Sequence, residues 1–109
     1  MIGIIGAVIE EAEAIKKEIK EIKETVISGI SFFTGKFNDR DVVFVQSGIG
    51  KVNAAITATL LIEKFKVSEV IFSGVAGSLD ERLKVGDVVI GHDIVQHDVD
   101  ATAFGYKMG

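Results

Sequence analysis

Two adjacent glutamates, Glu10 and Glu11, stand where an apolar run gives way to a charged segment in "GAVIEE". Ligands of α/β sheets bind beyond the carboxyl ends of the strands, so a carboxylate at this junction is well placed to act as a general base. A second interpretation is structural, because glutamates in the first turn of a helix interact favourably with its dipole. The spacing alone leaves both interpretations open.

Two glycine-containing segments also follow apolar runs, "SGIGKVNAA" at residues 47–55 and "GVAGSLD" at residues 74–80. Glycines between a strand and a helix can present backbone N–H groups to an anion. The first segment matches neither GxxxxGK[ST] nor GxGxxG, and a tight turn with close helix packing explains its glycines equally well. Together with the glutamate junction, these segments could converge on one cleft, which indicates more than either loop alone.

A third group of candidate residues consists of His92 and His97 with Asp93, Asp98 and Asp100. The histidines are five residues apart, which fits no i,i+4 pair on a helix and puts them on opposite faces of a strand. We therefore expect no metal site and no cofactor.

Phe104 and Tyr106 end the chain's last motif, "HDVDATAFGY". If the segment is extended, both rings lie on one side and form an apolar wall for a ligand or a partner chain. Packing into a core is the alternative.

The elements that must position these residues follow from the hydrophobic pattern. The apolar run at 2–9 predicts a strand buried on both faces. Ala12, Ile15, Ile19 and Ile22 recur at spacings of three and four, which predicts an amphipathic helix over 10–24. Further strands are expected at 25–28, 30–37, 41–47 and 67–73, the last of them buried, with a helix at 48–65 and two strands within 83–98.

This order predicts one α/β domain over residues 1–109, with a mixed, partly parallel sheet between helix layers. Turns are expected at Gly29 and at "NDRD". A sheet of this kind leaves an edge and a face uncovered unless something packs on them. We therefore expect that the chain is part of a longer domain, or that a partner covers the gap.

Composition excludes several classes of protein. The net charge is −4 with mixed signs, 48% of residues are hydrophobic, and there is no cysteine. These values disfavour nucleic-acid binding and disorder, and they exclude thiolate chemistry. The apolar start is too short to span a bilayer and lacks the pattern of a signal peptide. We expect a cytoplasmic protein that does not bind membranes.

Taken together, "GIIGAVIEEA", "SGIGKVNAA", "GVAGSLDERLKVGDVVI" and "HDVDATAFGY" resemble, in order and spacing, the N-terminal half of bacterial 5′-methylthioadenosine/S-adenosylhomocysteine nucleosidases. These belong to the nucleoside phosphorylase superfamily. The resemblance covers essentially the whole chain. It implies a three-layer α/β/α fold that is incomplete in this chain, a homodimer, and hydrolysis of an N-glycosidic bond that releases adenine.

The resemblance also implies roles for single residues. Glu11 would activate the attacking water, and Val8 and Ile49 would line the ribose and water side of the pocket. The residues implied to lie along the nucleoside are Val75, Ala76 and Gly77. Those implied to be lent across the dimer interface to the partner's alkylthio pocket are Ala101, Phe104 and Tyr106.

Glycoside cleavage with inversion needs a base for water on one face and an acid for the leaving group on the other. In the family, the acid and the glutamate that holds the ribose hydroxyls lie in the second half, which has no counterpart in these 109 residues. The resemblance therefore implies little or no turnover by this chain alone.

Three positions depart from related patterns. Val75 stands where the family commonly has a serine that helps hold the water, and Val8 replaces a common methionine. Phe72 occupies the position where phosphorylases of the superfamily carry a phosphate-binding arginine. Because an aromatic ring cannot neutralise phosphate, the sequence favours a hydrolase over a phosphorylase.

Two alternatives remain open. A related enzyme, such as another nucleosidase, a phosphorylase or a futalosine hydrolase, would share the same motifs. A non-catalytic fragment or assembly module would instead pair through its uncovered sheet and "TAFGY".

Overall fold

A computed structural model describes the backbone of residues 1–109 and all side chains except those of residues 9 and 11. The chain divides into two units, Met1–Ala76 and Gly77–Gly109, and each is described by itself.

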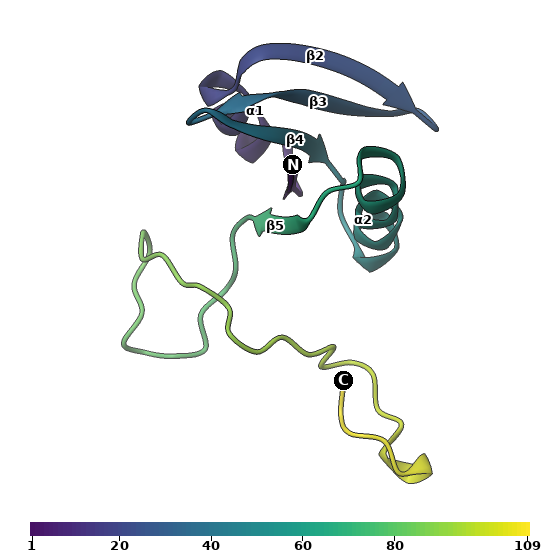
Figure 1. Cartoon of the computed structure of the whole chain (residues 1–109). Helices are drawn as coiled ribbons and strands as arrows, with labels where there is room; N and C mark the ends of the chain where they lie inside the picture. Colours follow the sequence, from purple (N-terminus) through teal and green to yellow (C-terminus); the bar gives the residue numbers. More distant parts are fainter. The chain divides into compact units, whose positions relative to one another are not determined.

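The first unit is built on one five-stranded sheet with strand order β2-β3-β4-β1-β5 (Figure 1). Strand β1 pairs in parallel with β4 and with β5, whereas β2, β3 and β4 pair antiparallel. The sheet is therefore mixed, as the sequence predicted. The elements are β1 Ile2–Gly6, α1 Ile9–Glu18, β2 Lys20–Ile27, β3 Ile30–Phe37, β4 Arg40–Gln46, α2 Lys51–Phe65 and β5 Glu69–Ser73.

The two helices cover opposite faces of the central strands. On one face, Ala12 of α1 belongs to a buried cluster with Val42 and Phe44 of β4. On the other face, Leu61 of α2 belongs to a cluster with Val43 and Val45. Successive strand residues point to opposite faces, so an uninterrupted apolar run such as "VVFV" is required. Neither described helix is long and apolar enough to cross a membrane.

Two short turns connect the antiparallel strands. Ser28 and Gly29 have φ values of 52° and 77° between β2 and β3, and Asn38 and Asp39 have values of 47° and 62° between β3 and β4. Two-residue hairpins favour positive φ because it matches the twist of the strands, and Gly, Asn and Asp tolerate it. The turns expected at Gly29 and "NDRD" are thus confirmed.

The long first helix expected over 10–24 is wrong. Helix α1 ends at Glu18, and the chain continues as β2, which pairs with β3 from Lys20 onward. Ile22 is 43% exposed, although its spacing from Ile19 suggested a shared buried face. Pairing with a neighbouring strand has overridden the local helical pattern.

Strand β5 forms where expected, but the prediction that it is buried is wrong. All five of its residues are exposed, and Phe72 retains 60% of its accessible surface. The strand pairs only with β1 at the edge of the sheet, and its side chains belong to neither buried cluster, so both of its faces stay exposed.

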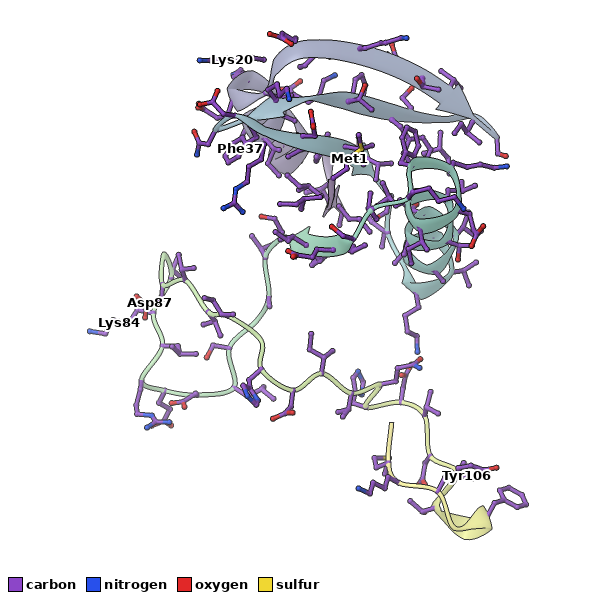
Figure 2. The ribbon with its side chains drawn as sticks, viewed as in Figure 1. Met1, Lys20, Phe37, Lys84, Asp87 and Tyr106 are labelled. Carbon is purple, nitrogen blue, oxygen red and sulfur yellow. The ribbon has the colours of Figure 1, made fainter. Side chains whose placement is uncertain are left out.

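The second unit contains one regular element, the 3₁₀ helix η1 at Thr102–Phe104. The two strands expected within 83–98 are not formed; the described backbone makes turns instead, including Asp87 N–H to Lys84 O at 3.0 Å (Figure 2). A strand requires a paired neighbour for its backbone groups, and this unit supplies none. Phe104 therefore lies in a helical turn, not in the extended segment predicted for it.

The side chain of Ile19 occupies the space where a side chain at Gly35 of β3 would lie. A Cβ atom at this position would lie 2.5 Å from Ile19 Cγ2 and 2.5 Å from the backbone oxygen of Lys20. We predict that Gly35→Ala lowers the free energy of unfolding by about 1–3 kcal/mol, as overpacking does. Urea denaturation measures this change. Gly77→Ala, where a Cβ meets nothing within 4 Å, is the control, and equal stability of both variants would contradict the packing.

Thr57 of α2 is fully buried, and its hydroxyl has no hydrogen-bond partner among the described atoms. Thr57→Val keeps the shape and removes the unsatisfied group, so we expect the free energy of unfolding to rise by about 1 kcal/mol. Thr59→Val, at an exposed position on the same helix, serves as control. A loss of stability on Thr57→Val in the same denaturation experiment would show that the hydroxyl is satisfied.

Candidate active site

The three parallel strands end in register at one edge of the sheet. Gly6, the last residue of β1, is paired with Gln46 of β4 on one side and with Ser73 of β5 on the other. The segments that follow these strands therefore begin side by side at the carboxyl ends of the strands. They are the three segments for which a shared cleft was suggested, and within Met1–Ala76 the structure brings their starting points together.

Two of these segments line a cleft with a volume of about 430 Å³. Val8 comes from the end of β1, and Ile49 comes from the loop between β4 and α2. The complete set of lining residues is Ala7, Val8, Glu10, Gln46, Gly48, Ile49 and Asn53.

The loop between β4 and α2 is tied to the end of β1. The Ser47 N–H donates to Gly6 O at 2.9 Å, and the Ser47 hydroxyl donates to Gly48 O at 2.9 Å. Helix α2 then begins without a side-chain cap, because the residue before it is Gly50. The backbone of this loop forms one wall of the cleft.

The structure describes the side chain of Glu10 but not that of Glu11. Glu10 lines the cleft. Glu11 is a residue of helix α1, but its side chain lies outside the described residues, so its role as the base stays a prediction.

Beyond β5, Val75 is 90% exposed and Ala76 is exposed at the end of the first unit. Phe72 pairs with Ile5 one residue before the strand ends. An aromatic ring thus stands at the position where the resemblance implies an arginine in phosphorylases. Gly77 begins the second unit.

Within the second unit, Ala101, Phe104 and Tyr106 cluster around η1. Phe104 N–H and Tyr106 N–H both donate to Ala101 O, and the two aromatic side chains are 84% and 72% exposed. Asp100 accepts hydrogen bonds from the hydroxyl and the N–H of Thr102, and these lower the pKa of its carboxyl group. Asp100 thus holds the turn as a carboxylate.

Among the histidine and aspartate residues of this unit, His92 and Asp93 form a pair between sequence neighbours. His92 Nδ1 lies 2.9 Å from Asp93 Oδ2, and both side chains are exposed. Among the described side chains, no three His, Asp or Glu residues are grouped to hold a metal ion.

A larger cavity of about 610 Å³ lies between α1 and strands β3 and β4. Its wall includes Phe33 and Lys16, whose Nζ lies 3.7 Å from the centre of the Phe33 ring. None of the predicted site residues whose side chains are described lines it, although Gln46 and Gly48 line both this cavity and the cleft. The smaller cleft, which Val8 and Ile49 line, is therefore the candidate site.

Sequence reasoning missed Gln46 and Asn53 as residues of the cleft. A polar residue that closes a buried strand was a usable signal for Gln46. Asn53 carried no comparable signal, since it lies in the first turn of α2 and its bond to Ile49 O is not visible in the sequence.

Known proteins resemble this chain over its full length. A family model described as the phosphorylase superfamily matches residues 1–109. A 5′-methylthioadenosine/S-adenosylhomocysteine nucleosidase of Staphylococcus haemolyticus is 55% identical over 109 residues, which are 100% of this chain and 48% of the relative. The chain spans about half the length of the curated relatives that it matches.

Solved structures give the same result. The nucleosidase of Colwellia psychrerythraea in complex with adenine superposes with a TM-score of 0.96 at 46% identity, covering 99% of this chain and 45% of that one. A futalosine hydrolase mutant of Helicobacter pylori has a TM-score of 0.88 at 39% identity, covering 99% and 50%. The resemblance inferred from the four sequence motifs is confirmed, and this chain belongs to the phosphorylase superfamily.

Proposed function

We propose that this chain supplies the strand-end half of a nucleosidase site that hydrolyses the N-glycosidic bond of 5′-methylthioadenosine or S-adenosylhomocysteine and releases adenine. The observation that carries the proposal is the common edge at Gly6, Gln46 and Ser73, from which the Val8 and Ile49 segments reach one cleft. The similarity to nucleosidases, one of them solved with adenine, supports the choice of substrate.

In this proposal Glu11 is the general base. It follows Glu10, which lines the cleft, and it lies in the first turn of α1, just beyond the end of β1. Glycoside cleavage passes through an oxocarbenium-like state, and inversion requires that a base activate water on the face opposite the leaving purine. Glu11 would take the proton from that water as its oxygen bonds to the anomeric carbon.

Water, and not phosphate, is the proposed nucleophile. Phe72 lies next to the end of β5 and is 60% exposed. Phosphate binding usually relies on cationic side chains or converging backbone N–H groups. An aromatic ring at this position offers neither, which supports hydrolysis over phosphorolysis.

The remaining predicted contacts belong to the same proposal. Val75, Ala76 and Gly77 would lie along the nucleoside, and the small or absent side chains of Ala76 and Gly77 allow close approach. Ala101, Phe104 and Tyr106 would be lent to the partner of a homodimer, for which the exposed aromatic rings are suited. A cytoplasmic location completes the proposal.

Futalosine hydrolysis is a second candidate, favoured by the similarity to the Helicobacter pylori structure. Release of adenine from 5′-methylthioadenosine, but of no hypoxanthine from inosine, would favour the first candidate. A non-catalytic assembly module would leave all these nucleosides intact even when this chain is fused to the complementary part of the Staphylococcus haemolyticus relative.

We predict that the 109-residue chain alone turns over 5′-methylthioadenosine slowly or not at all, because it lacks a counterpart of the family's acid and ribose clamp. Adenine release followed by chromatography measures this rate. Rates similar to those of the Staphylococcus haemolyticus relative would show that the 109 residues hold a complete catalytic set, and would overturn the half-site proposal.

For the base, we predict that Glu11→Gln lowers the hydrolysis rate at least about 100-fold, as loss of a general base does, while nucleoside affinity is kept. The test uses a fusion of this chain to the complementary part of the Staphylococcus haemolyticus relative, with Glu10→Gln as the matched control. Full activity of Glu11→Gln would remove Glu11 from the mechanism. If Glu10→Gln alone abolished activity, the base would be Glu10 and not Glu11.

A further inference from the structure

The loop between β4 and α2 lines the cleft, and its backbone is poorly restrained by packing. Gly48 and Gly50 both have positive φ values, 76° and 101°, and a Cβ at Gly50 would meet nothing within 4 Å. Ile49 between them is 79% exposed, so packing does not fix its backbone. Glycine has the widest choice of backbone conformations, and a residue flanked by two glycines needs another restraint to hold one orientation.

That restraint comes from a side chain of α2. Asn53 Nδ2 donates to Ile49 O at 2.7 Å, and the Asn53 amide also lies 3.5 Å from the position that a Cβ of Gly48 would occupy. Ala54 N–H bonds to Gly50 O, one residue farther along, so the helix itself does not use the Ile49 carbonyl in this way. The side-chain amide of Asn53 is thus bonded to the residue that precedes Gly50.

We propose that Asn53 is a positioning residue, which fixes the Ile49 peptide so that this wall of the cleft is preformed for a nucleoside. Asn53 lines the same cleft as Val8 and Ile49. Without the bond, Ile49 would have to be ordered when the ligand binds, and this ordering would reduce affinity. The inference rests on the proposed function, because the ligand it concerns is the nucleoside of that site.

The variant Asn53→Asp tests the positioning role without lowering the stability of the protein. The substitution keeps the size of the side chain, removes the N–H donor and faces a carboxylate oxygen toward the Ile49 carbonyl. Asn53 lies in the first turn of α2, where a negative charge is favourable to the helix dipole, so the melting temperature should not fall. Thr59→Ala is the matched control, because the Thr59 hydroxyl makes the same kind of bond to Ala55 O at 2.8 Å on this helix but does not line the cleft.

The experiment is performed on the fusion to the complementary part of the Staphylococcus haemolyticus relative, in the Glu11→Gln background, so that the site is complete and the nucleoside is not hydrolysed. Backbone ¹⁵N relaxation is recorded for residues 47–51, and calorimetric titration gives the dissociation constant for 5′-methylthioadenosine. In Asn53→Asp we expect order parameters at Ile49 and Gly50 to fall from about 0.85 toward 0.6. Affinity should weaken about 5-fold, as expected for loss of one hydrogen bond. Thr59→Ala should change neither value.

Other results would contradict either the positioning role of Asn53 or the proposed function. Unchanged order parameters in Asn53→Asp would overturn the positioning role, and so would a loosened loop with unchanged affinity. A fall in melting temperature equal to that of Thr59→Ala, with no change in affinity, would leave Asn53 with a structural role only. If the fusion with Asn53 intact does not bind 5′-methylthioadenosine, the proposed function fails and the inference fails with it, whereas binding that Asn53→Asp leaves intact contradicts only the inference.

Discussion

The in-register parallel pairing of β1 between β4 and β5 is the constraint on which the candidate site depends. It aligns Gly6, Gln46 and Ser73, so that segments far apart in the sequence leave the sheet together. Parallel strands require crossover connections, and α1 and α2 provide them on opposite faces. Gly3 lets α2 pack close to β1, since a Cβ there would lie 3.1 Å from Leu61. The burial that stabilises the sheet thus also fixes the cleft.

The residues that support the cleft are buried, whereas side chains proposed to contact the ligand are exposed. Val43, Phe44 and Val45 are fully buried and hold the strand that leads to the loop, whereas Ile49 and Val75 are largely exposed. Side chains with little packing of their own take their position from the backbone. For Ile49 that position is held by hydrogen bonds to its loop, from the end of β1 and from α2. In the proposed site, the positions of these side chains therefore depend on backbone geometry at the ends of the strands.

Much of the core could be predicted from the sequence, because residues buried on both faces leave an unbroken apolar run, as in β1 and β4. The error at Ile22 arose because the spacing of isoleucines fits a helix, while the competing pairing with β3 is not visible in the local pattern. Burial of β5 was predicted wrongly for a similar reason: apolar composition does not reveal that a strand lies at an edge. A shared edge for the site segments followed from strand order, but the bond from Asn53 to Ile49 depends on two glycine conformations that no spacing rule specifies.

The central claim is that the ends of β1, β4 and β5 form the nucleoside-binding edge, and chemical-shift mapping with 5′-methylthioadenosine tests it most directly. Shifts concentrated in residues 7–8, 47–50 and 74–76 are the predicted result. Shifts concentrated at Lys16 and Phe33, in the larger cavity beside α1, would contradict the claim, and so would a response to inorganic phosphate around Phe72 that equals the response to the nucleoside.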